Sequence, residues 1–120
     1  MKQRSCARFA VPDARVDWAL HDGGESWTRG CPLRNLSRGG VGFASEGPPG
    51  NGGAVRLRIL IEGEPPLELL GRVVWSLLSS GRTYHIGVQL APYGEGRGHN
   101  HPSALQRIAT LEAHFLPSAG

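Results

Sequence analysis

Apolar and polar residues alternate along several short stretches of this chain, which is the pattern of β-strands with one buried face. The stretches with this alternation span residues 14–20, 55–61, 67–75 and 84–90. Two further apolar runs, at 31–33 and 41–43, flank a polar segment with two glycines, and this arrangement predicts a hairpin. The pattern therefore predicts about six short strands, separated by loops rich in glycine and proline.

A closed barrel buries the apolar face of each of six strands and leaves no long edge unpaired. The alternation alone leaves a sandwich open as well. The same alternation predicts that Leu20 and the large aromatic residues Trp18, Phe43 and Trp75 face the core, where packing is their expected role.

One helix is predicted near the end of the chain, over about 103–116, after a glycine-rich connector at 91–102. Ser103 and Gln106 match a capping box, and Pro117 ends the helix. The apolar residues of this segment fall on one broad face: Leu105, Ile108, Ala109, Leu111, Phe115 and Leu116. We expect this face to pack on the barrel.

The length of 120 residues predicts a single domain over 1–120, with an arm at 1–13, a barrel at 14–90, and then the connector and helix. A net charge of +3, dominated by arginine, suits anionic ligands, but an arginine-rich composition also arises from GC-rich codon usage. The opening residues lack the apolar core of a signal peptide, and no apolar run could span a bilayer. We therefore expect a cytoplasmic protein without membrane insertion. Cys6 and Cys31 are expected to be free thiols.

Asn35 and Ser37 are two residues apart, so an extended backbone points both side chains the same way. That side offers an amide and a hydroxyl together. The next pair, Gly39 and Gly40, permits a turn with positive φ values or a close approach of the backbone to a ligand. From these residues alone, a polar turn and a binding site are both open.

Arg4 and Arg8 are spaced so that both guanidinium groups lie on one side of the segment. The planar donor fork of arginine binds phosphate oxygens, or the O6/N7 edge of guanine, through two hydrogen bonds. Such a pair also occurs in solvated basic tails. Residues before Ala14 show no strong packing pattern, so we expect this arm to be mobile until a ligand orders it.

The sequence contains none of the short motifs typical of common catalytic centres, such as GxSxG, Walker A or HExxH. An enzyme is therefore not expected. His99 and His101 could bind a metal, but no cysteine or carboxylate cluster lies near them in the sequence. We interpret them as solvated side chains and expect neither a metal nor a cofactor.

Taken together, these motifs resemble those of the PilZ family. The segment from Arg4 to Arg8 matches the family's RxxxR motif, and the segment from Asn35 to Gly40 matches its [D/N]xSxxG motif. Residues 71–75 (GRVVW) and 86–90 (IGVQL) are similar to its last strands.

The resemblance implies a mainly β fold, a small six-stranded antiparallel barrel with one C-terminal helix, that binds cyclic di-GMP. It also implies the roles of the site residues. Arg4 and Arg8 would bind phosphate and guanine, Asn35 and Ser37 would hydrogen-bond to a guanine, and Gly40 would allow close approach. Two neighbours are further candidates for the site: Arg38 and Gly39.

Two alternatives remain beside a cyclic di-GMP receptor. One is a PilZ-like adaptor that contacts proteins and binds no nucleotide. The other is a barrel that binds single-stranded nucleic acid, which would need exposed aromatic side chains and is not favoured by aromatics predicted to be buried. An effector protein is expected as a partner, and the ligand could induce a dimer.

Overall fold

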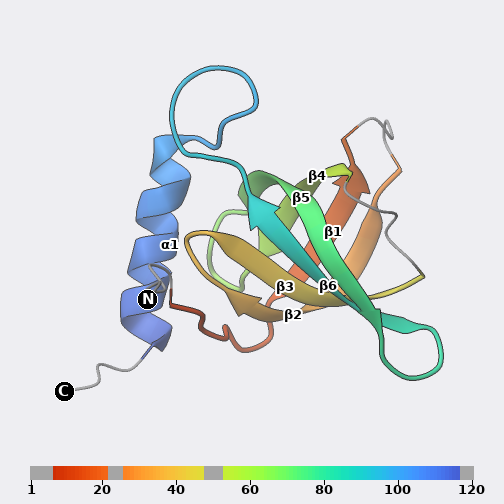
Figure 1. The fold of residues 1–120 in the computed structure, drawn as a ribbon. Coiled ribbons are helices and arrows are strands. Elements are labelled where there is room, and N and C mark those ends of the chain that lie inside the picture. Colours follow the sequence, from red (N-terminus) through yellow and green to blue (C-terminus); the bar gives the residue numbers. More distant parts are fainter. Residues whose placement is uncertain (1–6, 22–25, 48–52, 117–120) are drawn as a thin grey trace, which may run out of the picture.

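The computed structural model describes residues 7–21, 26–47 and 53–116. The elements have these bounds: β1 Arg15–Leu20, β2 Thr28–Leu36, β3 Gly40–Glu46, β4 Ala54–Leu60, β5 Leu67–Leu78, β6 Thr83–Leu90 and α1 Pro102–Phe115. Adjacent strands are antiparallel, and the sheet closes into a barrel in the order β1-β2-β3-β6-β5-β4. Figure 1 shows α1 beside one end of the barrel. The predicted six-stranded barrel with one helix is confirmed.

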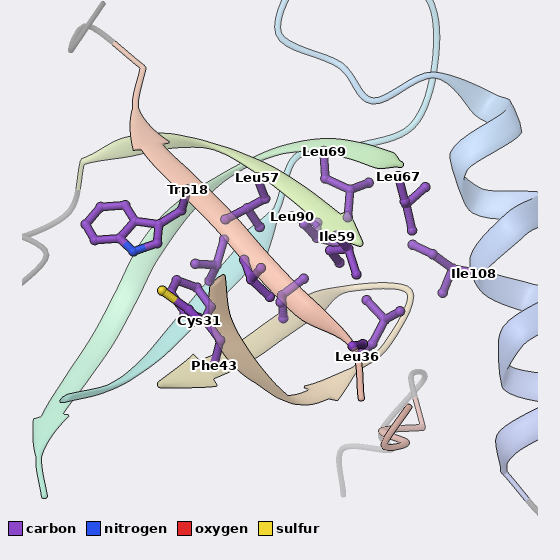
Figure 2. Close-up of a cluster of buried hydrophobic side chains, with 14 of the residues drawn as sticks. Trp18, Cys31, Leu36, Phe43, Leu57, Ile59, Leu67, Leu69, Leu90 and Ile108 are labelled. Carbon is purple, nitrogen blue, oxygen red and sulfur yellow. The ribbon is translucent and has the colours of Figure 1, made fainter. Parts of the chain in front are cut away.

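The barrel interior is filled by the inward residues of all six strands, as the alternation predicts. Side chains with almost no exposed surface include Val16, Leu36, Phe43, Leu57, Ile59 and Ile86. Figure 2 shows Ile108 of α1 pointing toward Leu67 at the end of the barrel nearest the helix. Ile108 is fully buried, which contributes roughly 1.5–3 kcal/mol to stability and fixes α1 against the barrel.

Trp75 does not face the core, which corrects the prediction from alternation. The pairing of β5 with β6 shifts register between Val73 and Trp75, so one extra residue, Val74, enters the strand. Such a bulge reverses the side on which later residues point. Val73 is buried, whereas Trp75 is 46% exposed on the outside of the barrel. Leu20 is also exposed, because it is the last residue of β1.

The start of α1 also differs from the predicted capping box. The N-cap is His101, whose Nδ1 accepts a hydrogen bond from the backbone N–H of Ser103 at 3.0 Å. Pro102 occupies the first turn, where the absence of its N–H costs no helical hydrogen bond. The buried residues of the helix are Ala104, Ile108 and Leu111, so the buried face is centred on Ile108 and omits Leu105.

The segment before β1 packs more tightly than its sequence predicts. Phe9 and Val11 are buried in the core, and Phe9 exchanges two backbone hydrogen bonds with Leu36, at 3.0 and 2.8 Å. Two apolar residues are too short a pattern to reveal a strand, but a bridge to β2 orders them. The expectation of a mobile arm is therefore wrong from Phe9 onward. Arg4 and Cys6 lie outside the described residues.

Cys31 is a free thiol buried near Trp18 and Ser45. Burial raises the pKa of the Cys31 thiol, and hydrogen bonds from Ser45 and Trp18 oppose that effect in part. Because the thiolate is the reactive form, this cysteine is a packing residue and not a nucleophile.

Candidate ligand-binding site

The turn between β2 and β3 is closed by Ser37. Its Oγ accepts hydrogen bonds from the backbone N–H groups of Gly39 (3.2 Å) and Gly40 (3.0 Å). The backbone N–H of Ser37 donates to the carbonyl oxygen of Gly40 at 2.9 Å. Ser37 is buried, so its hydroxyl oxygen shapes the turn instead of pointing into solvent.

A glycine at position 40 was expected either to adopt a positive φ in the turn or to allow a close approach of the backbone. Gly40 does not adopt a positive φ, so the first expectation is wrong. The other reason, close approach, applies to the protein itself. A Cβ on Gly40 would lie 3.0 Å from the carbonyl oxygen of Val88 on the neighbouring strand β6. That distance is tighter than most Cβ contacts, and a backbone oxygen cannot move aside as a side chain can.

Asn35 lies on the outside of the barrel across a glycine of β3. Asn35 pairs with Gly42, and its Oδ1 lies 2.9 Å from the place that a Cβ on Gly42 would occupy. The amide therefore rests on the bare backbone of Gly42. The missing side chain of Gly42 is what allows the Asn35 amide to lie flat on the sheet.

A second side chain, Trp75 of β5, rests in the same way on a glycine of the neighbouring strand β6. Gly42 pairs with Gly87 of β6, and Gly87 pairs with Trp75 of β5. A Cβ on Gly87 would overlap the indole of Trp75, so the ring lies directly over Gly87. The four residues form one row across β2, β3, β6 and β5, about 14 Å long at ~4.8 Å per strand. We call this row, Asn35-Gly42-Gly87-Trp75, the glycine-floored row. It offers an amide at one end and an aromatic face at the other.

A second row lies two residues along the strands. Gly40 pairs with Gln89, and Gln89 pairs with Arg72, so both polar side chains stand on the outer face beside the glycine-floored row. Next to them is a cavity of about 480 Å³. Its walls are largely apolar and include Leu70, Arg72, Gln89, Leu90, Ala91 and Pro92. This volume is in the range of small-molecule sites.

Arg8 is brought next to the motif by its neighbour in the chain. Because Phe9 is bridged to Leu36 and points into the core, the exposed Arg8 stands outside the barrel, beside Ser37 at the end of β2. The structure thus brings Arg8, Asn35, Ser37 and Gly40 together. It cannot place Arg4, which lies outside the described residues.

Arg38, at the tip of the turn, is bonded to the far end of the chain. Its Nε lies 3.1 Å from Oε1 of Glu112 on α1. Its carbonyl oxygen accepts a hydrogen bond from the hydroxyl of Tyr93 at 2.7 Å. The guanidinium group is about half exposed, so it remains accessible to a ligand on the outer face. The turn, the connector and α1 are therefore directly connected.

Comparison with protein families matches residues 2–100 to the PilZ domain. The chain belongs to the PilZ family. Comparison with curated proteins finds no match.

Solved structures share this PilZ fold at low sequence identity. The inhibitor of motility MotI/DgrA of Bacillus subtilis has 15% identity and a TM-score of 0.69, over 92% of this chain and 50% of that chain. MrkH of K. pneumonia, in a complex with c-di-GMP, has 17% identity and a TM-score of 0.67, over 92% and 51%. The PilZ domain of YcgR from Escherichia coli, with c-di-GMP, has 13% identity and a TM-score of 0.65, over 92% and 88%. This chain spans about half the length of the MotI and MrkH chains.

In this PilZ domain, alternation along the sequence did not single out Trp75, Gly42 and Gly87 as members of the candidate site. Each becomes visible only when the register across four strands is known. A signal does exist, because a glycine in the middle of a strand often marks a bulge or a close approach. Gly42 and Gly87 both interrupt apolar strands in this way.

The two histidines of the connector have structural partners. His101 caps α1, and Nδ1 of His99 lies 3.2 Å from the carbonyl oxygen of Arg97. In the described residues, no group of three or more His, Cys, Asp and Glu side chains could hold a metal ion. None of the helices formed by the described residues is long and apolar enough to cross a bilayer.

Proposed function

We propose that this PilZ domain is a cyclic di-GMP receptor and that the glycine-floored row binds the nucleotide. The row itself carries the proposal. It combines a hydrogen-bonding amide, a floor without side chains and an exposed aromatic face on one outer surface, with Arg8 and Arg38 beside it. A planar base with an anionic backbone matches this chemistry. The solved structures of MrkH and YcgR, whose titles name c-di-GMP, support the choice of ligand.

Each side chain has a role that follows from its chemistry. The exposed face of Trp75 stacks on one guanine, which contributes about 1–3 kcal/mol. Asn35 hydrogen-bonds to a guanine edge. Arg4 and Arg8 bind phosphate oxygens and the O6/N7 edge through their donor forks. Gly40 has no side chain, so the ligand can approach the backbone of the second row closely.

The turn residues act mainly by position. Ser37 and Gly39 hold the turn in shape beside Asn35. Arg38 contributes positive charge beside the phosphates while it stays paired with Glu112. Because this turn is bonded to α1 and to Tyr93, binding of the ligand changes the surface that an effector protein contacts. The protein thus acts as an adaptor and not as an enzyme.

The two alternatives lead to different observations. A barrel for single-stranded nucleic acid needs several exposed rings, and Trp75 is the one aromatic residue among the large apolar side chains that the described chain exposes. An adaptor without a nucleotide would use the exposed Trp75 in a protein contact, as tryptophan commonly does at interfaces. Both alternatives would leave cyclic di-GMP unbound.

The test is calorimetric titration with cyclic di-GMP, cyclic di-AMP and GTP. Cyclic di-GMP should bind more tightly than cyclic di-AMP, because mispaired contacts to the wrong base cost on the order of 1–3 kcal/mol each. Trp75→Ala should weaken binding about 5- to 150-fold, the equivalent of one lost stacking contact. Trp27→Ala is the matched control, because Trp27 packs under Arg56 and Arg58 on a different part of the barrel. Equal binding of the two cyclic dinucleotides would rule out guanine recognition. Failure of all three ligands to bind would rule out the receptor.

A further inference from the structure

The second half of β5 is paired on one side only. The pairing of β4 with β5 ends at Ala54 and Arg72, and one more backbone hydrogen bond joins Val73 to Gly53 at 3.1 Å. Pairing with β6 continues to Leu78. Among the described residues, no strand pairs with the other edge of Val74–Leu78. Figure 1 shows this part of the β5–β6 hairpin extending beyond the barrel, away from α1.

This open edge is also apolar. Val74 is 51% exposed, Trp75 46%, Leu77 65% and Leu78 52%, so four large apolar side chains stand in solvent within five residues. Natural proteins protect such edges with charged residues or proline. Between Arg72 and Arg82 the sequence reads VVWSLLSSG and contains neither. An unprotected apolar edge is a template for another strand.

We propose that the open edge of β5, Val74–Leu78, pairs with the same edge of a second copy of this chain. The segment is suited to its own copy because it carries no charge, so antiparallel pairing brings no like charges together. An antiparallel pair about a two-fold axis closes on itself and consumes both open edges. The unpaired backbone groups of each strand then satisfy those of the other.

The geometry of this pair has a consequence for the glycine-floored row. Antiparallel strands are related by an axis perpendicular to the sheet, so the outer faces of both copies lie on the same side. Trp75, next to Ser76 at the centre of Val74–Leu78, would then stand near the two-fold axis in both copies. The proposal itself does not depend on nucleotide binding, because no described residue pairs with this edge in the protein without a ligand.

The test is sedimentation of the ligand-free protein over a range of concentrations. An interface of this size is small, so we expect a dimer that forms at about 10–1000 µM. Leu77→Lys places a charge on the exposed edge and should abolish the dimer. Leu20→Lys is the matched control. Leu20 is also an exposed leucine, at 44% against 65% for Leu77, but its row meets β5 at Gly71, about 20 Å before Leu77. This variant should dimerise like the wild type.

Thermal unfolding of both variants verifies that the fold is retained. A wild type that stays monomeric up to about 1 mM overturns the proposal. So does a dimer that survives Leu77→Lys, or a series of larger oligomers in place of a closed pair.

Amide hydrogen exchange gives a second, independent measurement. Alternate amides within Val74–Leu78 should exchange more slowly at high protein concentration, because those donors become bonded to the second copy. Amides of β3, which is paired on both sides, should show no dependence on concentration. Dimerisation without added protection of the β5 edge would place the interface elsewhere and refute the proposal.

Discussion

Gly42→Ala tests whether the glycine beneath Asn35 positions the amide. The new Cβ would lie 2.9 Å from Oδ1 and 3.3 Å from both Cγ and Nδ2 of Asn35. Ordinary van der Waals contact begins at 3.4 Å, so the amide must move by about 0.5 Å. The side chain can do so by rotating, because Asn35 is not fully buried.

The expected magnitudes differ for folding and for binding. Alanine is favoured over glycine in a strand by roughly 0.5–1 kcal/mol, which offsets the cost of rotating Asn35, so the free energy of unfolding should change by less than about 1 kcal/mol. Displacing the amide removes its hydrogen bond to guanine, which contributes about 0.5–1.5 kcal/mol. The dissociation constant for cyclic di-GMP should therefore rise about 2- to 13-fold.

The decisive measurement is a double-mutant cycle by calorimetry. Asn35→Ala should weaken binding by a similar factor, and the double variant should bind no more weakly than Asn35→Ala alone, because both changes remove the same contact. Gly53→Ala is the control, because its Cβ would meet only Leu20, at an ordinary 3.8 Å. If the two losses add, or if Gly42→Ala binds as the wild type does while Asn35→Ala does not, the glycine does not position the amide.

Three further changes test the arginines and the turn. Arg8→Ala should weaken the binding free energy measured by calorimetry by about 1.5–3 kcal/mol and leave thermal stability nearly unchanged. The control Arg82→Ala should change neither quantity. An unchanged affinity of Arg8→Ala would show that Arg8 is not part of the site. Ser37→Ala should lower the free energy of unfolding in urea by about 1–3 kcal/mol, because two turn amides lose their acceptor; an unchanged midpoint would refute that role. Glu112→Gln removes the negative charge that neutralises Arg38. Calorimetry should therefore show cyclic di-GMP binding that is about 2- to 5-fold tighter and more dependent on salt. Weaker binding would contradict this.

The strands were predictable because the interior of a small barrel is filled mostly by apolar side chains. Val16, Leu57, Ile59 and Ile86 stand at alternate positions and are all almost completely buried. Their burial leaves little freedom of register, because a slip of one residue would expose the whole set. The helix was predictable for the same reason, since Ile108 recurs with its apolar neighbours at helical spacing.

The errors share a different physical origin. Phe9 and Val11 are apolar, but a single bridge to Leu36 depends on tertiary contact and leaves too short a pattern to detect. His101 caps α1 through a ring nitrogen, whereas Ser103 matches the usual capping sequence but lies two residues past the N-cap. In each case a specific long-range or local contact prevailed over an average preference.

For the candidate site, the motif locates Asn35, Ser37 and Gly40 but not the surface around them. The glycine-floored row depends on which residues of four strands face one another, and two of those strands are distant in the sequence. Trp75 adds a second obstacle, because a bulge reverses its side of the strand. Pairing register is a tertiary property, and alternation within one strand cannot supply it.

The bulge at Val74 connects the two surfaces for which we propose functions. With regular alternation, Trp75 would point into the interior, which Phe43, Ile86 and other buried side chains fill. The extra residue turns the ring outward, where only a glycine at 87 can accept it. The described pairing of β4 with β5 ends at Ala54 and Arg72, next to this bulge. One backbone irregularity thus places the aromatic end of the ligand site at the start of the open edge, so binding at one surface bears directly on the strand that forms the other.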